Sequence, residues 1–264
     1  MKQKNFKFAF LSGNMLKILA AVCMVCDHVG LMFFPTVPIF RIIGRIAFPI
    51  FAFMIAEGCK YTKNKIKYFG MIFLMGVVFQ MVYYVVDKSL YFCIFITFST
   101  SILMIYALQL FKKQVFSKWN SSYLIRVVAS LLLFSALVFG VYVLNSGLEV
   151  FGKEITVDYG FWGCMLPVFA SLLHADEKDE NQRLLQKIDC VPLHVCAMAV
   201  GLFLTAYFLT KSKFLYQYYS LIAIIPLLLY SGKRGKKKMK YFFYVFYPAH
   251  LVLLYGLSFL LAII

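Results

Sequence analysis

The sequence predicts an all-α fold, a polytopic bundle of transmembrane helices with about nine spans. Of its 264 residues, 62% are hydrophobic and 14% are charged, whereas an ordinary globular chain is about 45–50% apolar and about 25% charged. The apolar residues form continuous runs of the ~20 residues that a helix needs to cross a ~30 Å hydrocarbon core. They do not alternate with period two, as the strands of a transmembrane barrel would.

The apolar runs divide the chain into candidate spans, and little sequence is left over for a soluble domain. We expect the spans at residues 15–34, 38–57, 68–86, 90–111, 123–144, 158–174, 191–210, 214–230 and 241–263. The run at 158–174 is short, and it could be a re-entrant segment instead of a full crossing. We treat residues 1–264 as a single integral membrane domain.

The charged residues predict the orientation of these spans. The chain carries 27 Lys and Arg against 11 Asp and Glu, a formal net charge of +16. With a cytoplasmic N-terminus, most cations fall in cytoplasmic loops, at residues 2–7, 60–67, 112–118, 178–187 and 233–240. Loops rich in Lys and Arg translocate poorly, so this bias predicts a cytoplasmic N-terminus and an external C-terminus. The cations are divided among short loops, which disfavours nucleic-acid binding.

Ionisable residues inside the spans are the candidates for function, because each is costly in a bilayer unless it is paired or hydrated. With a helical rise of ~1.5 Å per residue, His28 and Arg45 lie at a similar depth, ~9–12 Å below the outer surface. His250 reaches ~14 Å into the last span from the cytoplasmic side. The short link between the first two spans makes them antiparallel neighbours. We therefore expect Asp27, His28, Arg45 and His250 to form one buried polar cluster.

Two prolines lie next to this expected cluster. Pro49 removes the helical hydrogen bond to the carbonyl of Arg45, and Pro248 does the same for Tyr244. Each freed carbonyl needs another partner, which a hydrated cavity would supply. Kinks that serve only helix packing explain each proline, taken alone, equally well.

The residue types in this cluster are the parts of an acyl-transfer site. A neutral imidazole can take up and return a proton near neutral pH, and an arginine can bind phosphate or stabilise an oxyanion. The same groups are also the parts of a proton relay. Structural roles are open too: an interhelical hydrogen bond for His28, an ion pair of Asp27 with Arg41 or Arg45, and snorkelling beside Lys60 for Glu57.

Three stretches of the sequence resemble the TraX family of integral membrane acetyltransferases. They are Leu16-Lys17-Ile18 leading to Cys26-Asp27-His28-Val29-Gly30, the stretch from Arg41-Ile-Ile-Gly-Arg45 through Pro49 to Glu57-Gly58, and Tyr244-Val-Phe-Tyr247-Pro248-Ala-His250-Leu251. The named member of that family acetylates the N-terminal amine of conjugative pilin. Its layout is similar to that of acyltransferase type 3 proteins and of heparan glucosaminide acetyltransferase.

The resemblance implies a role for each matching residue. His28 becomes the general base, with Asp27 beside it, and Arg45 binds the donor or stabilises the oxyanion. We expect the substrate-binding residues to be Arg41, Glu57, Tyr247 and His250. The donor is expected to be acetyl-CoA or another acyl-CoA, and no metal is expected.

The expected function is transfer of an acyl group from cytoplasmic acyl-CoA to an amine or hydroxyl acceptor, at the extracytoplasmic side of a bacterial plasma membrane. The acceptor is open: a small molecule, a glycan or a protein N-terminus. The alternative is a proton-coupled transporter or exporter that uses Asp27, His28 and Arg45 as a relay. Transporters commonly contain two similar halves, and the pattern of the first two spans does not recur in the second half of this sequence.

Overall fold

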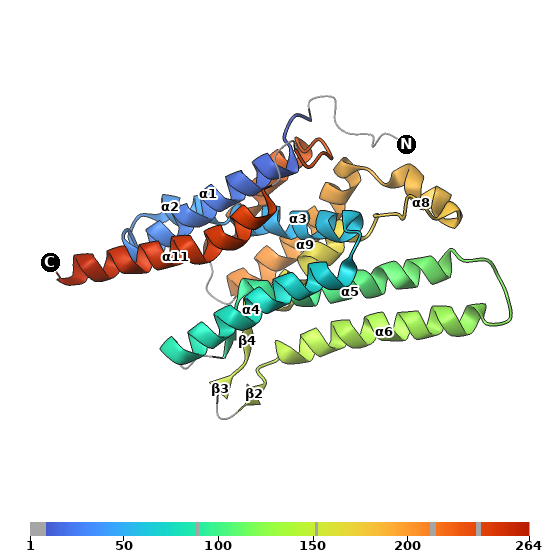
Figure 1. Cartoon of the computed structure of the whole chain (residues 1–264), viewed down its shortest axis with the longest axis horizontal. Helices are drawn as coiled ribbons and strands as arrows, with labels where there is room; N and C mark the ends of the chain where they lie inside the picture. The colour runs from blue at the N-terminus through green and yellow to red at the C-terminus, as the bar shows by residue number, and fades with distance from the viewer. Residues whose placement is uncertain (1–8, 88–89, 151–152, 212–214, 236–238, 264) are drawn as a thin grey trace. The chain divides into compact units, whose positions relative to one another are not determined.

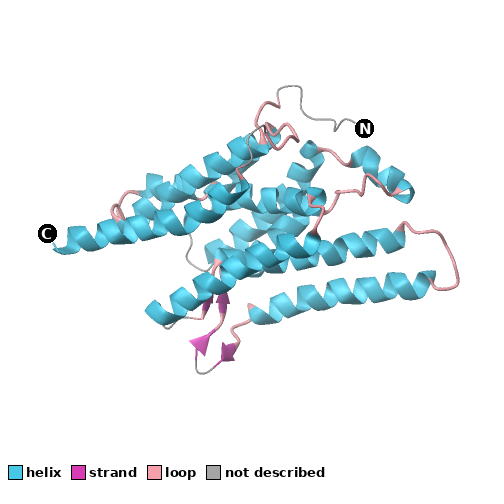
Figure 2. Ribbon diagram, in the orientation of Figure 1, coloured by secondary structure: helices cyan, strands magenta, loops and turns pink. Residues whose placement is uncertain are grey.

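The structure is a computed structural model that describes residues 9–87, 90–150, 153–211, 215–235 and 239–263. The described chain is built almost entirely from helices, and its strands are two residues long (Figures 1 and 2). Contacts gather the chain into two compact units, of which unit 1 holds residues 1–51 and 210–264 and unit 2 holds residues 52–209. The expectation of one domain stays a prediction, and each unit is described by itself.

Six described helices are long and apolar enough to cross a membrane, by length and composition. They are Gly13–Met32, Pro38–Tyr61, Lys65–Val85, Ile94–Val115, Tyr123–Leu144 and Val191–Thr210. Three shorter apolar helical stretches lie within the other expected spans, at Gly160–Ser171, Tyr216–Leu228 and Val245–Leu261. The all-α, membrane-spanning class is therefore confirmed, while the number of nine spans and the orientation of the termini stay predictions.

Unit 1 brings the two ends of the chain together. Its elements are α1 (Gly13–Met32), α2 (Pro38–Gly44), the start of α3 (Ala47–Tyr61), the 3-10 helix η2 (Leu215–Ala223), α10 (Ile224–Leu228) and α11 (Lys240–Ile263). Helix α1 packs against α2 and α11 (Figure 1). The first amide groups of α1 lack partners within the helix, and the segment before α11 supplies them, because Gly13 and Asn14 donate to the carbonyls of Lys233 and Arg234.

The second expected span is broken into α2 and α3. The break falls at Arg45 and Ile46, four and three residues before Pro49. Proline cannot donate the amide hydrogen bond that would continue the helix back to Arg45. The two helices therefore meet at the position that the sequence predicts, whereas α11 continues through Pro248.

Unit 2 contains the middle of the chain. Its elements are the rest of α3, α4 (Lys65–Asp87), β1 (Tyr91–Phe92), α5 (Ile94–Val115), α6 (Tyr123–Leu144), β2 (Glu149–Val150), β3 (Lys153–Glu154), β4 (Thr156–Val157), α7 (Gly160–Ser171), η1 (Glu180–Gln182), α8 (Arg183–Ile188) and α9 (Val191–Lys211). Helix α5 is central, since α4, α6 and α7 all pack against it. Strand β1 pairs in parallel with β4, and β2 pairs antiparallel with β3.

Helix α7 is shorter than the span expected at 158–174. Its 12 residues extend for only ~18 Å at 1.5 Å per residue, which is less than a ~30 Å core. The helix begins after Tyr159, whose φ of 61° is left-handed, and Gly160 has the same φ. An irregular segment follows α7 and carries His174, so this end of the expected span is not helical.

Candidate functional site: two clusters of ionisable groups

The first cluster joins α1 to α2 through Asp27. Its carboxylate oxygens lie 2.9 Å from Arg41 Nη1 and 3.0 Å from Arg45 Nη2. The arginines are four residues apart and so share one side of the helix. Arg45 also donates from Nη1 to Gln217 Oε1 on η2, at 3.4 Å. Asp27 thus offsets two cations, and we call this group, together with His28 and His250, the Asp27 cluster.

Gly44 allows α2 to approach Asp27 closely. A Cβ atom at this position would collide with the Cβ atom and carboxylate of Asp27. The missing side chain is therefore required for the packing that lets both arginines reach one carboxylate.

The two histidines of the Asp27 cluster are in contact between α1 and α11. The ring centroids of His28 and His250 are 5.3 Å apart, and the rings are tilted by 46°. His250 Nδ1 lies 3.0 Å from the carbonyl oxygen of Phe246, which can only accept, so this geometry assigns the proton to Nδ1. His250 Nε2 then has a lone pair, and it makes no hydrogen bond within the described residues. The ring of Tyr247 packs edge-on against His250, with centroids 5.4 Å apart.

His28 has no hydrogen bond to any residue that the structure describes, and an interhelical hydrogen bond for His28 stays a prediction. Its side chain is half-buried, whereas those of Arg45 and His250 are buried. The structure therefore gathers the expected residues Asp27, His28, Arg45 and His250 in unit 1. It pairs Asp27 with the arginines instead of with His28, which is the ion-pair alternative that the sequence left open. The chemical roles of these residues stay predictions.

Glu57 does not belong to the Asp27 cluster. It lies in unit 2, where its Oε1 atom is 3.3 Å from His174 Nε2. The ring of His174 contacts that of His194 on α9, with centroids 4.4 Å apart. All three side chains are buried, with exposures of 4%, 4% and 0% for Glu57, His174 and His194. The Glu57 side chain is therefore enclosed by protein and does not snorkel to the membrane surface.

A buried ion pair borders these three residues. Lys60 Nζ lies 2.7 and 2.8 Å from the two carboxylate oxygens of Asp189, and His194 Nε2 lies 2.9 Å from Asp189 Oδ1. Burial works to raise the pKa of Asp189, but His194 and Lys60 outweigh it and hold that pKa well below its usual range. We call Glu57, Lys60, His174, Asp189 and His194 the Glu57 cluster.

Lys112 on α5 fixes the chain segment that carries His174. Its ammonium group donates to the carbonyls of Ser171, Leu172 and His174 at 2.9, 2.9 and 3.0 Å. The carbonyls of Ser171 and Leu172 lie at the end of α7, where a carbonyl has no partner within the helix.

Sequence reasoning missed His174, Asp189 and His194. No local motif connects them, because 15 and five residues separate them in sequence and all are distant from Glu57. A signal was nevertheless present: in the predicted topology, Glu57, His174 and His194 all fall at the cytoplasmic ends of their spans, hence at one depth.

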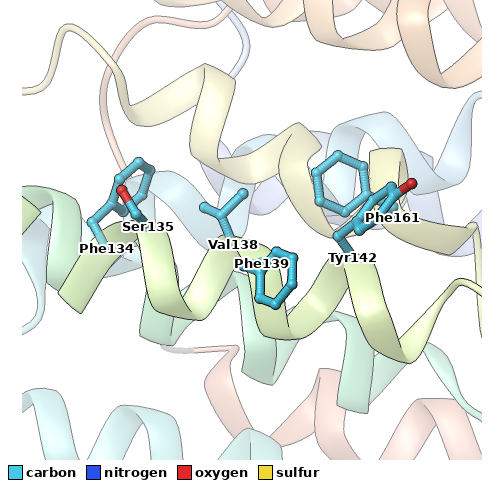
Figure 3. A pocket seen from close by; sticks show the side chains of 6 residues that line it. All are labelled: Phe134, Ser135, Val138, Phe139, Tyr142 and Phe161. Atoms are coloured by element: carbon cyan, nitrogen blue, oxygen red, sulfur yellow. The ribbon is translucent and has the colours of Figure 1, made fainter. Parts of the chain in front are cut away.

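An open groove on α6 offers no comparable chemistry. It is lined by Phe134, Ser135, Val138, Phe139, Tyr142 and Phe161 (Figure 3). None of these residues carries a carboxylate, an imidazole or a cation. An apolar face of this kind on a membrane helix fits contact with lipid acyl chains.

Together the apolar helices and the ionisable groups inside them define a polytopic helical membrane protein. The chain belongs to the TraX family, because the family model described as TraX protein matches residues 12–258.

Two curated proteins are similar to parts of the chain. An uncharacterized protein of Rickettsia prowazekii (strain Madrid E) is 42% identical over 67 residues, 25% of this chain and 25% of that protein. A probable fimbrial assembly protein FimC, serogroup H1, of Dichelobacter nodosus is 32% identical over 76 residues, 27% of this chain and 31% of that protein. The chain thus matches only about a quarter to a third of their length. No solved structure matches.

Proposed function

We propose that the chain is a membrane-embedded acyltransferase that moves an acetyl or other acyl group from acyl-CoA to an amine or hydroxyl acceptor. His28 is the general base of this proposal. Arg45 binds the donor or stabilises the oxyanion, and Asp27 positions the arginines. Arg41, Tyr247 and His250 complete the proposed substrate-binding site; Glu57 was also expected there, and its described contacts lie in unit 2.

The observation that carries the proposal is the partial exposure of charged groups within apolar helices. The side chains of Asp27 and Arg41 are 17% and 21% exposed, and half-buried His28 follows Asp27 on α1. Charged groups inside a membrane face protein, water or a ligand, because contact with lipid is too costly. An ion pair that is only partly covered therefore favours a hydrated site that a polar substrate can enter.

The chemistry requires one proton carrier and one anion partner. The imidazole of His28 takes the proton from the acceptor amine or hydroxyl as that nucleophile attacks the thioester carbonyl. The carbonyl oxygen then carries negative charge, which an arginine stabilises. When the carbon–sulfur bond breaks, the imidazolium returns its proton to the CoA thiolate, so that the products are the acylated acceptor and free CoA thiol.

The proposed setting is a bacterial plasma membrane, crossed nine times, with a cytoplasmic N-terminus and an external C-terminus. Acyl-CoA would approach the basic cytoplasmic loops, and the acceptor would arrive from the extracytoplasmic side. The name of the Dichelobacter nodosus relative, a probable fimbrial assembly protein, adds the N-terminal amine of a fimbrial protein to the acceptors worth testing.

The test uses the full chain, purified and reconstituted in nanodiscs. Acetyl-CoA is added with a set of amine, glycan and peptide acceptors, and both thiol release and transfer of radiolabelled acetyl groups are measured. Replacing His28→Ala is expected to lower the rate 10²–10⁴-fold, the usual contribution of a general base. Cys26→Ala, two residues earlier on α1, is the matched control and is expected to leave the rate unchanged.

Two results would contradict this assignment. Full turnover by the His28→Ala variant would remove His28 as the base. If no acyl-CoA stabilises the wild-type protein or releases its thiol, the acyltransferase proposal fails and the proton-coupled transporter is favoured instead.

A further inference from the structure

Three metal-ligating side chains converge inside unit 2 from separate elements. Glu57 comes from α3, His174 from the segment after α7, and His194 from the first turn of α9. One potential ligand atom from each residue lies within 4.8 Å of the other two. The three residues are far apart in sequence, so the fold itself brings this donor set together.

The spacing of these atoms is close to that of a coordinated ion. A tetrahedral ion with metal–ligand distances of ~2.1 Å holds its ligand atoms ~3.4 Å apart. Glu57 Oε1 and His174 Nε2 are already 3.3 Å apart. Small rotations of the side chains would bring the third ligand atom from within 4.8 Å to the same separation.

Asp189 contacts one ring nitrogen of His194 and leaves the other free to coordinate an ion. Its Oδ1 atom lies 2.9 Å from His194 Nε2, which leaves Nδ1 as the atom that can coordinate. A ligand histidine that donates its other ring hydrogen to a carboxylate is the common arrangement around protein-bound metals. Lys60, whose charge would repel a cation, is itself offset by both oxygens of Asp189.

The ring nitrogens of this cluster lack the partners that burial demands. The two candidate ligand atoms, His174 Nε2 and His194 Nδ1, make no hydrogen bond within the described residues, and the two side chains are 4% and 0% exposed. A buried polar atom without a partner costs about 1–3 kcal/mol. A bound cation would accept a lone pair from each ring and remove that cost.

We propose that Glu57, His174 and His194 bind one divalent transition-metal ion of the zinc class. Two imidazoles and one carboxylate form a donor set found in zinc sites, with a fourth position left for water or the second carboxylate oxygen. Because the site is sealed, its role is to join α3, the segment after α7, and α9. The sequence predicted no metal, and the proposal is independent of the acyltransferase function.

Metal content is the direct test. The full chain is purified in detergent without chelators, and its zinc, iron, cobalt and manganese are counted by mass spectrometry. We expect about one ion per chain in the wild type. His194→Ala and Glu57→Gln are expected to weaken binding at least 10-fold in a titration with Co²⁺, followed by its visible absorption. His250→Ala, which changes the other histidine cluster, is the matched control and should bind as the wild type does.

Even if the variants do not fold, a chelator experiment on the wild type tests the proposal. Treating the wild type with a strong chelator is then expected to lower its melting temperature, and adding Zn²⁺ should restore it. A wild type that contains no stoichiometric metal, binds no Co²⁺ and melts at the same temperature with chelator or Zn²⁺ would overturn the site. So would equal Co²⁺ affinity in folded His194→Ala and wild-type protein.

Discussion

The Asp27 cluster and the Glu57 cluster use the same side-chain types in opposite ways. In the Asp27 cluster, one carboxylate offsets two arginines, and Asp27 and Arg41 are partly exposed. In the Glu57 cluster, two carboxylates, two imidazoles and a lysine are buried together, with exposures of 5% or less for each side chain. An accessible site can exchange protons and substrates, whereas a sealed site can only hold the structure together. The comparison therefore supports keeping the proposed chemistry with the first cluster and the proposed metal, with its effect on stability, with the second.

The largest expected difference is the effect of removing a carboxylate charge from each cluster. Asp189→Asn leaves the ammonium of Lys60, 4% exposed, without its counter-charge, and breaking a buried pair costs about 3–5 kcal/mol. Asp27→Asn leaves Arg41, which is 21% exposed, able to reach water, so we expect a loss of about 1–2 kcal/mol. Thermal unfolding in detergent measures both variants, with exposed Lys63→Ala as the control. Equal losses for the two Asn variants would mean that the difference in burial does not determine the cost of removing the carboxylate charge.

A smaller effect is expected from filling the space between α1 and α2. In Gly44→Ala the new methyl group meets Asp27, including its Cβ atom, which cannot rotate away. We expect the helices to separate, at a cost of about 1–3 kcal/mol, and acyl transfer to fall because the arginines lose their common carboxylate.

Gly256→Ala, on α11, is the matched control for that substitution. A Cβ atom there meets nothing within 4 Å, so stability should be unchanged or slightly raised by the better helix propensity of Ala. If Gly44→Ala kept the wild-type melting temperature and transfer rate, close packing at Asp27 would not be required.

The Asp27 cluster could be predicted from the sequence because its constraints are local. The short link between the first two spans fixes them as neighbours, and the depth of each residue follows from the helical rise. Pro49 predicts the break at Arg45 in the same local way, because proline has no amide hydrogen to donate to the carbonyl four residues earlier. That Asp27 pairs with arginines and not with His28 depends on side-chain directions across α1 and α2, which depth alone does not determine.

The contacts of the Glu57 cluster could not be predicted, although its residues share one depth in the predicted topology, because they connect distant parts of the chain. Helix α7 ends after 12 residues, and Lys112 on another helix holds the carbonyls that follow. That contact places His174 inside the unit, whereas a hydropathy window assigns it to the end of a span. A different local break interrupts the span expected at 214–230, where a 3-10 helix precedes the short α10 and Pro226 has no amide hydrogen to donate.

The smallest expected change in stability comes from one substitution, Gln→Met, made once in each unit. Gln182 is 3% exposed, accepts from the amide of Asp176 at 3.0 Å and donates to Asp179 at 3.2 Å, so Gln182→Met should cost about 1–2 kcal/mol. Gln217 is 1% exposed, accepts one long bond from Arg45, and has an amide nitrogen without a hydrogen bond among the described residues. Methionine removes that buried amide while Asp27 still holds Arg45, so we expect Gln217→Met to change stability by less than about 0.5 kcal/mol. A melting temperature that falls as far for Gln217→Met as for Gln182→Met would show that the amide is a necessary part of the Asp27 cluster, and Arg45 would then depend on η2 as well as on α1.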